Sequence, residues 1–171
     1  MDEKILEKIA NAVHKEHDWK KDQIRIDEAQ ELKHGSCSFY AVRHTVRPLS
    51  YVLNYAVLSG ETVLSVSDEQ AAAKILDACG SDATAGWWAE VVTRFHEELG
   101  QGIVLHDAKD NFGAIDQIQS AKREFMPPKF SEDASGKSVT FYLFEAEEFA
   151  VYFVKATRNK DKTITVNKAA L

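Results

Sequence analysis

The pattern of apolar and polar positions is clearest from Ser36 to Val66, a stretch rich in aromatic and β-branched residues. Such residues favour pleated strands that are at least half buried. Pro48 cannot donate a hydrogen bond to a sheet ladder, and Gly60 supplies the freedom that a tight hairpin needs. The pattern therefore predicts three antiparallel strands, at about residues 36–47, 50–58 and 61–66. Because the middle strand is apolar on both faces, we expect it inside the sheet.

Elsewhere the apolar period lengthens to about 3.6 residues, which is typical of amphipathic helices. Helices are predicted at about residues 2–16, 67–79, 82–99 and 112–124. A capping-box pair, Ser67 and Gln70, marks the start of the second helix. In the third helix Phe95 lies at the centre of the apolar stripe, so we expect it to be fully buried against a sheet.

Shorter alternating segments complete the set of strands. The segment 24–33 is apolar on one face and is predicted to be an edge strand. Further strands are expected at about residues 103–105, 129–131, 138–145, 149–158 and 162–168.

These elements predict an α+β fold, a mostly antiparallel sheet built from two strand meanders with amphipathic helices packed on one face. Tyr40 and Tyr142 are 102 positions apart (142 − 40), and Tyr51 and Tyr152 are 101 apart (152 − 51). A fixed offset is typical of an internal duplication, but any two meanders draw on the same few residue types. The chain is thus one domain, 1–171, or two fused halves of about 1–80 and 81–171.

Length and charge narrow the function classes. A chain of 171 residues can bury a sizeable core. Its net charge of −6 argues against nucleic acid as the main partner, because phosphate binding needs a basic face. No apolar run approaches the length of a membrane span, so no membrane association is expected. The oligomeric state is not indicated by any pattern.

The two cysteines bear on the compartment. Cys37 and Cys79 belong to no metal or redox spacing, and both lie in apolar contexts. The first residues lack the features of a signal peptide. A signal peptide that has already been removed is the alternative. We therefore expect two reduced, buried thiols in a cytoplasmic protein.

Chemical motifs are weak throughout. His14 and His17 lie at a helix end without the further ligands of a zinc pattern. Cys37 and His44 are seven positions apart and so face opposite sides of a strand. The acids Glu145, Glu147 and Glu148 fall at a turn, where solvated charges are the usual explanation. We expect no catalytic residue, no metal and no cofactor.

Candidate binding residues come from the central strands and the third helix. An aromatic centre with an arginine-bearing rim is common at protein interfaces, although a buried core that tapers into a solvated strand end explains the same residues. Trp87 lies at the margin of its helix stripe, where it either borders an interface or wraps the edge of the core. The candidates are Tyr40, Arg43, His44, Arg47, Tyr51 and Trp87.

Two function classes follow. The first is a non-enzymatic protein-binding module, such as an inhibitor, an immunity-type protein or an adaptor. The alternative is a small-molecule-binding domain or an enzyme, with a pocket between the sheet and the helix that carries Trp87 and Trp88.

Overall fold

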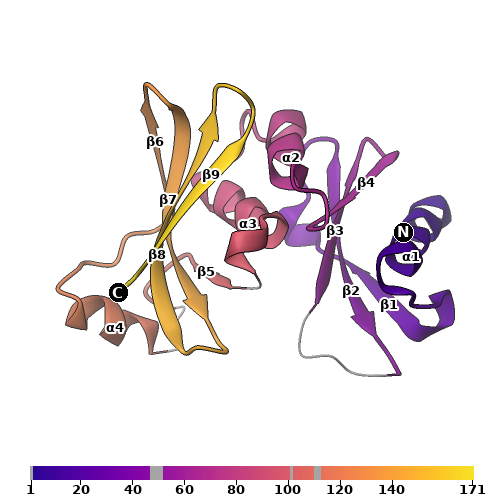
Figure 1. Ribbon diagram of the computed structural model, residues 1–171, viewed down its shortest axis with the longest axis horizontal. Helices are drawn as coiled ribbons and strands as arrows, with labels where there is room; N and C mark the ends of the chain where they lie inside the picture. Colours follow the sequence, from indigo (N-terminus) through magenta and orange to yellow (C-terminus); the bar gives the residue numbers. More distant parts are fainter. Residues whose placement is uncertain (1, 47–51, 101, 110–112) are drawn as a thin grey trace. The chain divides into compact units, whose positions relative to one another are not determined.

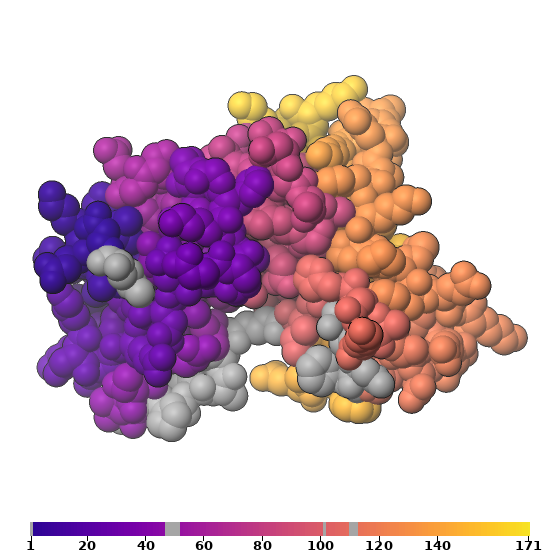
Figure 2. All heavy atoms as spheres, turned by 180° about the vertical axis from the view of Figure 1, so that it is seen from behind, coloured from indigo at the N-terminus to yellow at the C-terminus, as the bar shows by residue number. Residues whose placement is uncertain are grey.

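A computed structural model of the chain describes residues 2–46, 52–100, 102–109 and 113–171. The chain forms two compact units, Met1–Asp82 and Ala83–Leu171. Each unit contains an antiparallel sheet with helices packed against it, which confirms the predicted α+β class (Figure 1). Figure 2 shows the atoms of the first unit from indigo to magenta and those of the second from magenta to yellow.

The first unit is a four-stranded meander between two helices. Its elements are α1 (Glu3–His17), β1 (Ile24–Glu28), β2 (Cys37–His44), β3 (Leu53–Leu58), β4 (Thr62–Ser65) and α2 (Ala71–Cys79), with short 3₁₀ turns at Lys21–Gln23 and Gln30–Leu32. The strand order is β1-β2-β3-β4. The doubly apolar β3 therefore lies inside the sheet and β1 lies at its edge, as the sequence predicts.

Helices cover both faces of this sheet rather than one. Ile9 and Val13 of α1 pack on the face that carries Tyr40 and Tyr55. Side chains alternate along a strand, so Phe39 points to the opposite face, where α2 contacts β2 and β3. Figure 1 shows α1 and α2 on opposite sides of the strands. The physical reason is β3, which is apolar on both faces and needs cover on both.

The second unit is a five-stranded sheet with two helices. Its elements are α3 (Ala85–Phe95), a 3₁₀ turn at Glu97–Leu99, β5 (Ile103–Leu105), α4 (Ala114–Ser120), β6 (Lys129–Asp133), β7 (Gly136–Glu145), β8 (Ala150–Asn159) and β9 (Ile164–Ala170). The strand order is β5-β7-β8-β9, and β6 also pairs with β7. The long strand β7 is therefore the centre of this unit.

The two helices of the second unit also take opposite faces of its sheet (Figure 1). Ile118 of α4 packs with Tyr142 and Phe144. On the other face α3 contacts β5, β6 and β7. Phe95 is 2% exposed, which confirms that the apolar stripe of α3 is buried.

Helix ends account for most differences from the predicted bounds. α2 begins at Ala71, and the side chain of Gln70 makes no capping hydrogen bond, so the predicted capping box is wrong. The carboxylate of Asp68 instead accepts a hydrogen bond from the backbone N–H of Gln70. α3 ends at Phe95 because His96 adopts an extended conformation. These ends depend on local backbone conformations that an apolar pattern does not register.

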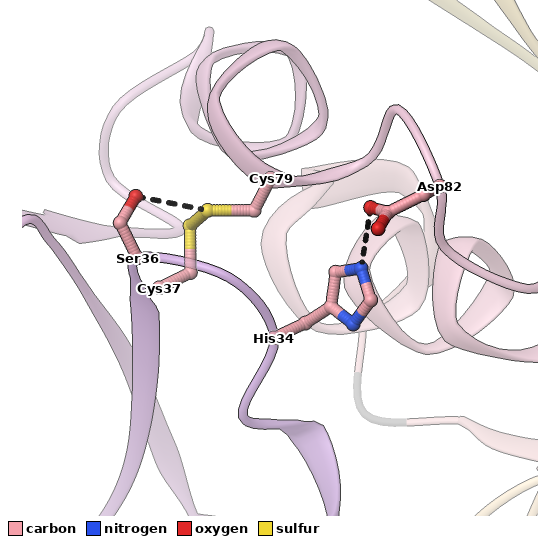
Figure 3. The surroundings of a disulfide bond; sticks show 5 residues. All are labelled: His34, Ser36, Cys37, Cys79 and Asp82. Atoms are coloured by element: carbon pink, nitrogen blue, oxygen red, sulfur yellow. Dashed lines mark hydrogen bonds and ion pairs between the residues drawn. A yellow bond between two sulfur atoms is a disulfide. The ribbon is translucent and has the colours of Figure 1, made fainter.

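A disulfide joins Cys37, at the start of β2, to Cys79, at the end of α2 (Figure 3). The expectation of two free thiols is therefore wrong. The cysteines are 42 positions apart, but α2 folds back over β2 and brings their Cα atoms to 6.2 Å, within the range that a disulfide spans. Beside the bond, Ser36 Oγ lies 3.6 Å from Cys79 Sγ, and the His34 ring lies 3.0 Å from the Asp82 carboxylate.

The two meanders share strand order but not a single offset. Both β2-β3-β4 and β7-β8-β9 run in chain order. Tyr40 pairs with Tyr55, and Tyr142 pairs with Phe153. The first strands thus align at an offset of 102 (142 − 40) and the second at 98 (153 − 55), so the first connection is longer by four residues. Tyr51 lies outside the described residues.

A polar network attaches the end of α1 to the sheet. The Glu16 carboxylate accepts hydrogen bonds from Tyr55 Oη and from Ser65 Oγ, each at 3.0 Å. Burial raises the pKa of Tyr55, and the negative charge of Glu16 raises it further. Tyr55 and Ser65 are both buried, so the carboxylate satisfies hydroxyl groups that water does not reach.

The Tyr55→Phe variant is expected to lose about 1.5–3 kcal/mol of unfolding free energy, the usual contribution of a hydrogen bond to a charged group. Because the pKa of Tyr55 is higher in the folded than in the unfolded chain, its contribution is complete below about pH 10 and falls as the pH rises further. Urea unfolding of both proteins between pH 8 and pH 11 tests this. An equally steep alkaline decline in the variant would contradict it.

The disulfide is expected to contribute about 4 kcal/mol to the stability of the first unit, because it closes a span of 42 residues. In denaturant we expect no reactive thiol without reductant and two with it. The Cys37→Ala/Cys79→Ala double variant should unfold at a lower urea concentration than the oxidised protein. Two reactive thiols in denaturant without reductant would show that the bond does not form.

Candidate protein-binding surface

The hairpin turn between β7 and β8 presents an aromatic side chain to solvent. Glu145 and Ala150 form the last pair of the ladder, and Phe149 precedes Ala150. Phe149 is 64% exposed and has φ = +51°. Bulky L-residues rarely adopt this left-handed conformation, because the Cβ atom approaches the following carbonyl oxygen. An exposed phenylalanine in a costly conformation points to a role other than folding.

The side chain of Gln117, on α4, holds this turn by two hydrogen bonds. Its Nε2 donates to the carbonyl oxygen of Phe149, and its Oε1 accepts from the backbone N–H of Val151, both at 3.1 Å. The amide thus takes the place of a neighbouring strand. The Phe149 ring also meets Phe144 edge to face, with the centroids 5.6 Å apart. The two hydrogen bonds and the ring contact restrict the conformations that this turn can adopt.

The same turn carries three carboxylates, those of Glu145, Glu147 and Glu148. Glu145 forms an ion pair with Lys168, whose ammonium lies 4.0 Å above the Tyr152 ring. Tyr152 Oη donates a hydrogen bond to Glu148, and this bond raises the pKa of Tyr152 to about 12. Glu147 is exposed. With three carboxylates and one lysine, the turn is acidic. We call Phe149 together with Glu145, Glu147 and Glu148 the Phe149 turn.

The residues predicted for binding do not gather into one surface. Tyr40 is 3% exposed and belongs to the core beneath α1, and Trp87 is 9% exposed. His44 packs edge-on against Trp19, with the ring centroids 4.8 Å apart. Arg43 points to the opposite face of β2 and binds Asp27. Strand alternation separates these side chains. Arg47 and Tyr51 lie outside the described residues.

The tryptophan pair on α3 contributes to packing. Trp88 is 5% exposed and meets Phe130 of β6 edge to face at 5.3 Å. Lys137 Nζ lies 3.9 Å from the centroid of the Phe130 ring and 4.7 Å from that of Trp88. These contacts fill the space between α3 and the β6–β7 hairpin. Trp87, at 9% exposure, is an edge-of-core residue rather than a half-exposed one.

A charged cluster that the sequence reasoning did not identify connects β5 to α3. Glu90 Oε1 lies 2.8 Å from His106 Nε2, and Glu90 Oε2 accepts from Arg94 Nε at 3.1 Å. Burial raises the pKa of Glu90, but the hydrogen bond to His106 and the charge of Arg94 outweigh it and hold the pKa below its usual range. Gly86 lets the imidazole approach, since a Cβ there would lie 3.2 Å from the ring. In the sequence, only the spacing of four residues between Glu90 and Arg94 could have indicated this cluster, because it places the two side chains side by side on a helix.

The described residues show neither a metal-binding cluster nor a membrane-spanning helix. Within residues 2–46, 52–100, 102–109 and 113–171, no three His, Cys, Asp or Glu side chains converge as a metal site. Across the same ranges, no helix has the length and apolarity for a membrane crossing. Comparison with protein families, curated proteins and solved structures finds no match to this chain.

The Phe149→Gly variant is expected to match or exceed the wild-type stability, by up to about 1 kcal/mol, because glycine adopts a positive φ without penalty. Phe144→Ala is the matched control in the same cluster. Phe144 is 2% exposed, and its truncation should cost about 3–5 kcal/mol. Urea unfolding measures both. A loss above about 1.5 kcal/mol in Phe149→Gly would identify Phe149 as a structural residue.

Proposed function

We propose that this chain is a non-enzymatic protein-binding module that inserts Phe149 into an apolar pocket of a partner protein. The observation that carries the proposal is a phenylalanine held ordered and 64% exposed in a left-handed conformation. Aromatic side chains of this kind supply much of the binding energy at interfaces once a pocket excludes water from them. The rigid turn is suited to an inhibitor, immunity-type or adaptor protein.

Charge specifies the partner further. The acidic turn favours a pocket edged by lysine or arginine, and a net charge of −6 supports the same choice. Opposite charges at the edge of an interface mainly accelerate association, so binding should weaken as the salt concentration rises.

The compartment is part of the proposal. A disulfide between two buried cysteines is typical of proteins in oxidising surroundings, and it replaces the reduced thiols that favoured the cytoplasm. We infer that the chain meets its partner in an oxidising compartment.

Affinity capture from the native source with the oxidised chain tests the proposal. Wild type should retain a protein in near-stoichiometric amount, and Phe149→Gly should lose it by at least about tenfold in affinity, as expected for a hot-spot aromatic. Met126→Ala, which alters another exposed side chain of the same unit, is the matched control and should retain the partner. Capture that is equal for wild type and Phe149→Gly would overturn the proposal, as would the absence of a retained protein.

The Glu147→Lys variant tests the proposed attraction between the acidic turn and a basic partner. Reversal of this one charge of the turn should slow association and reduce the affinity about threefold to tenfold at low salt, with a smaller difference at high salt. Surface plasmon resonance with the captured partner measures both rates. An association rate that does not change would show that the partner's rim is not basic.

A further inference from the structure

Two arginines lie directly opposite each other on the first sheet. Arg25 of β1 and Arg43 of β2 are partners in the antiparallel register. Their side chains therefore share one face of the sheet and lie side by side. Like charges in this position normally destabilise a strand pair, so the arrangement needs a compensating charge.

Asp27 supplies that charge and fixes both side chains. Its Oδ1 accepts a hydrogen bond from Arg25 Nε at 2.9 Å, and its Oδ2 accepts from Arg43 Nη1 at 2.8 Å. The carboxylate bridges the guanidinium groups with one oxygen for each. The side chains of Arg25 and Arg43 remain 70% and 54% exposed, whereas that of Asp27 is 34% exposed. We call these three residues the arginine fork.

We propose that the arginine fork binds an oxyanion, either a carboxylate or a phosphate group, between its two guanidinium groups. A guanidinium carries five N–H donors in a rigid plane, so each arginine can bind Asp27 and a second acceptor together. Hydrogen bonds between arginine and an oxyanion are charge-assisted and frequently bidentate, which makes them stronger than neutral ones.

Order, rather than excess charge, makes this a site. The fork carries a net charge of +1, because Asp27 neutralises one of its two arginines. Exposed arginines normally lose much rotamer freedom when they bind a ligand. Asp27 restricts both side chains before a ligand arrives and thereby reduces this loss. The fork lies in the first unit and is independent of the Phe149 turn.

The fork and simple charge attraction predict opposite effects of the Asp27→Asn variant. Removal of the carboxylate raises the positive charge but releases both guanidinium groups. If order matters, Asp27→Asn binds inorganic phosphate at least about threefold more weakly than wild type. If charge alone matters, it binds more tightly. Asp22→Asn makes the same change in net charge at an exposed position outside the fork, and it should bind phosphate as tightly as wild type or slightly more tightly.

Titration of the oxidised full chain with sodium phosphate at constant ionic strength, followed through the arginine Nε–H resonances, measures these affinities. We expect Arg25 and Arg43 to shift together in wild type, with a dissociation constant of millimolar order for so small an anion. Arg43→Lys keeps the charge but loses the planar donors, and it should also weaken binding. Amide spectra of each variant establish that the sheet is intact.

Two outcomes would overturn the proposal. One is that neither arginine shifts in wild type up to about 20 mM phosphate, several times the expected constant. The other is that Asp27→Asn binds as tightly as Asp22→Asn. A parallel titration with a hexaglutamate peptide distinguishes the sources of the anion. Tighter binding of the peptide assigns the site to an acidic segment of a protein, and tighter binding of phosphate assigns it to the free anion.

Discussion

The need to cover both faces of each sheet governs the rest of this structure. The inner strands β3 and β7 carry buried apolar side chains on both sides, so a single layer of helices would leave one face of each in water. Each unit meets this need with one helix per face. Tyr55 and Phe39 sit beneath different helices of the first unit, and Tyr142 of the second unit packs with α4 while β7 also contacts α3. The polar contacts act within this arrangement.

The candidate surface follows from how the second sheet is covered. α4 spans Ala114–Ser120 and reaches the β8 end where the hairpin turns. There it places Gln117 against the backbone of residues 149–151, so the element that buries Phe144 also orders Phe149. Binding groups on loops held by a rigid scaffold are common in proteins, and here the scaffold contacts are the Gln117 amide and the Phe144 ring.

Strand and helix periods predicted much of the fold. The double-sided apolar pattern around Tyr55 placed β3 inside its sheet, and the stripe through Phe95 identified the buried side of α3. Periodicity does not report which distant elements meet. It therefore missed the partner of Cys37, which depends on the path of α2, and the contact of His106 with Glu90. Tyr40 was named as an interface candidate beside the alternative of a buried core, because aromatic residues occur in both settings.

The Phe149 turn and the arginine fork share one physical device. In each, one polar side chain restrains an exposed group: Gln117 holds the backbone at Phe149, and Asp27 holds Arg25 and Arg43. Neither restraint buries apolar area, so neither adds much to stability. An exposed side chain that is ordered without being buried gains nothing for folding, but it enters a complex with less entropy to lose. The same reasoning explains why composition does not reveal such sites. The residue types are ordinary. What distinguishes these sites is the contact between a particular polar side chain and a particular exposed group, and composition does not record such contacts.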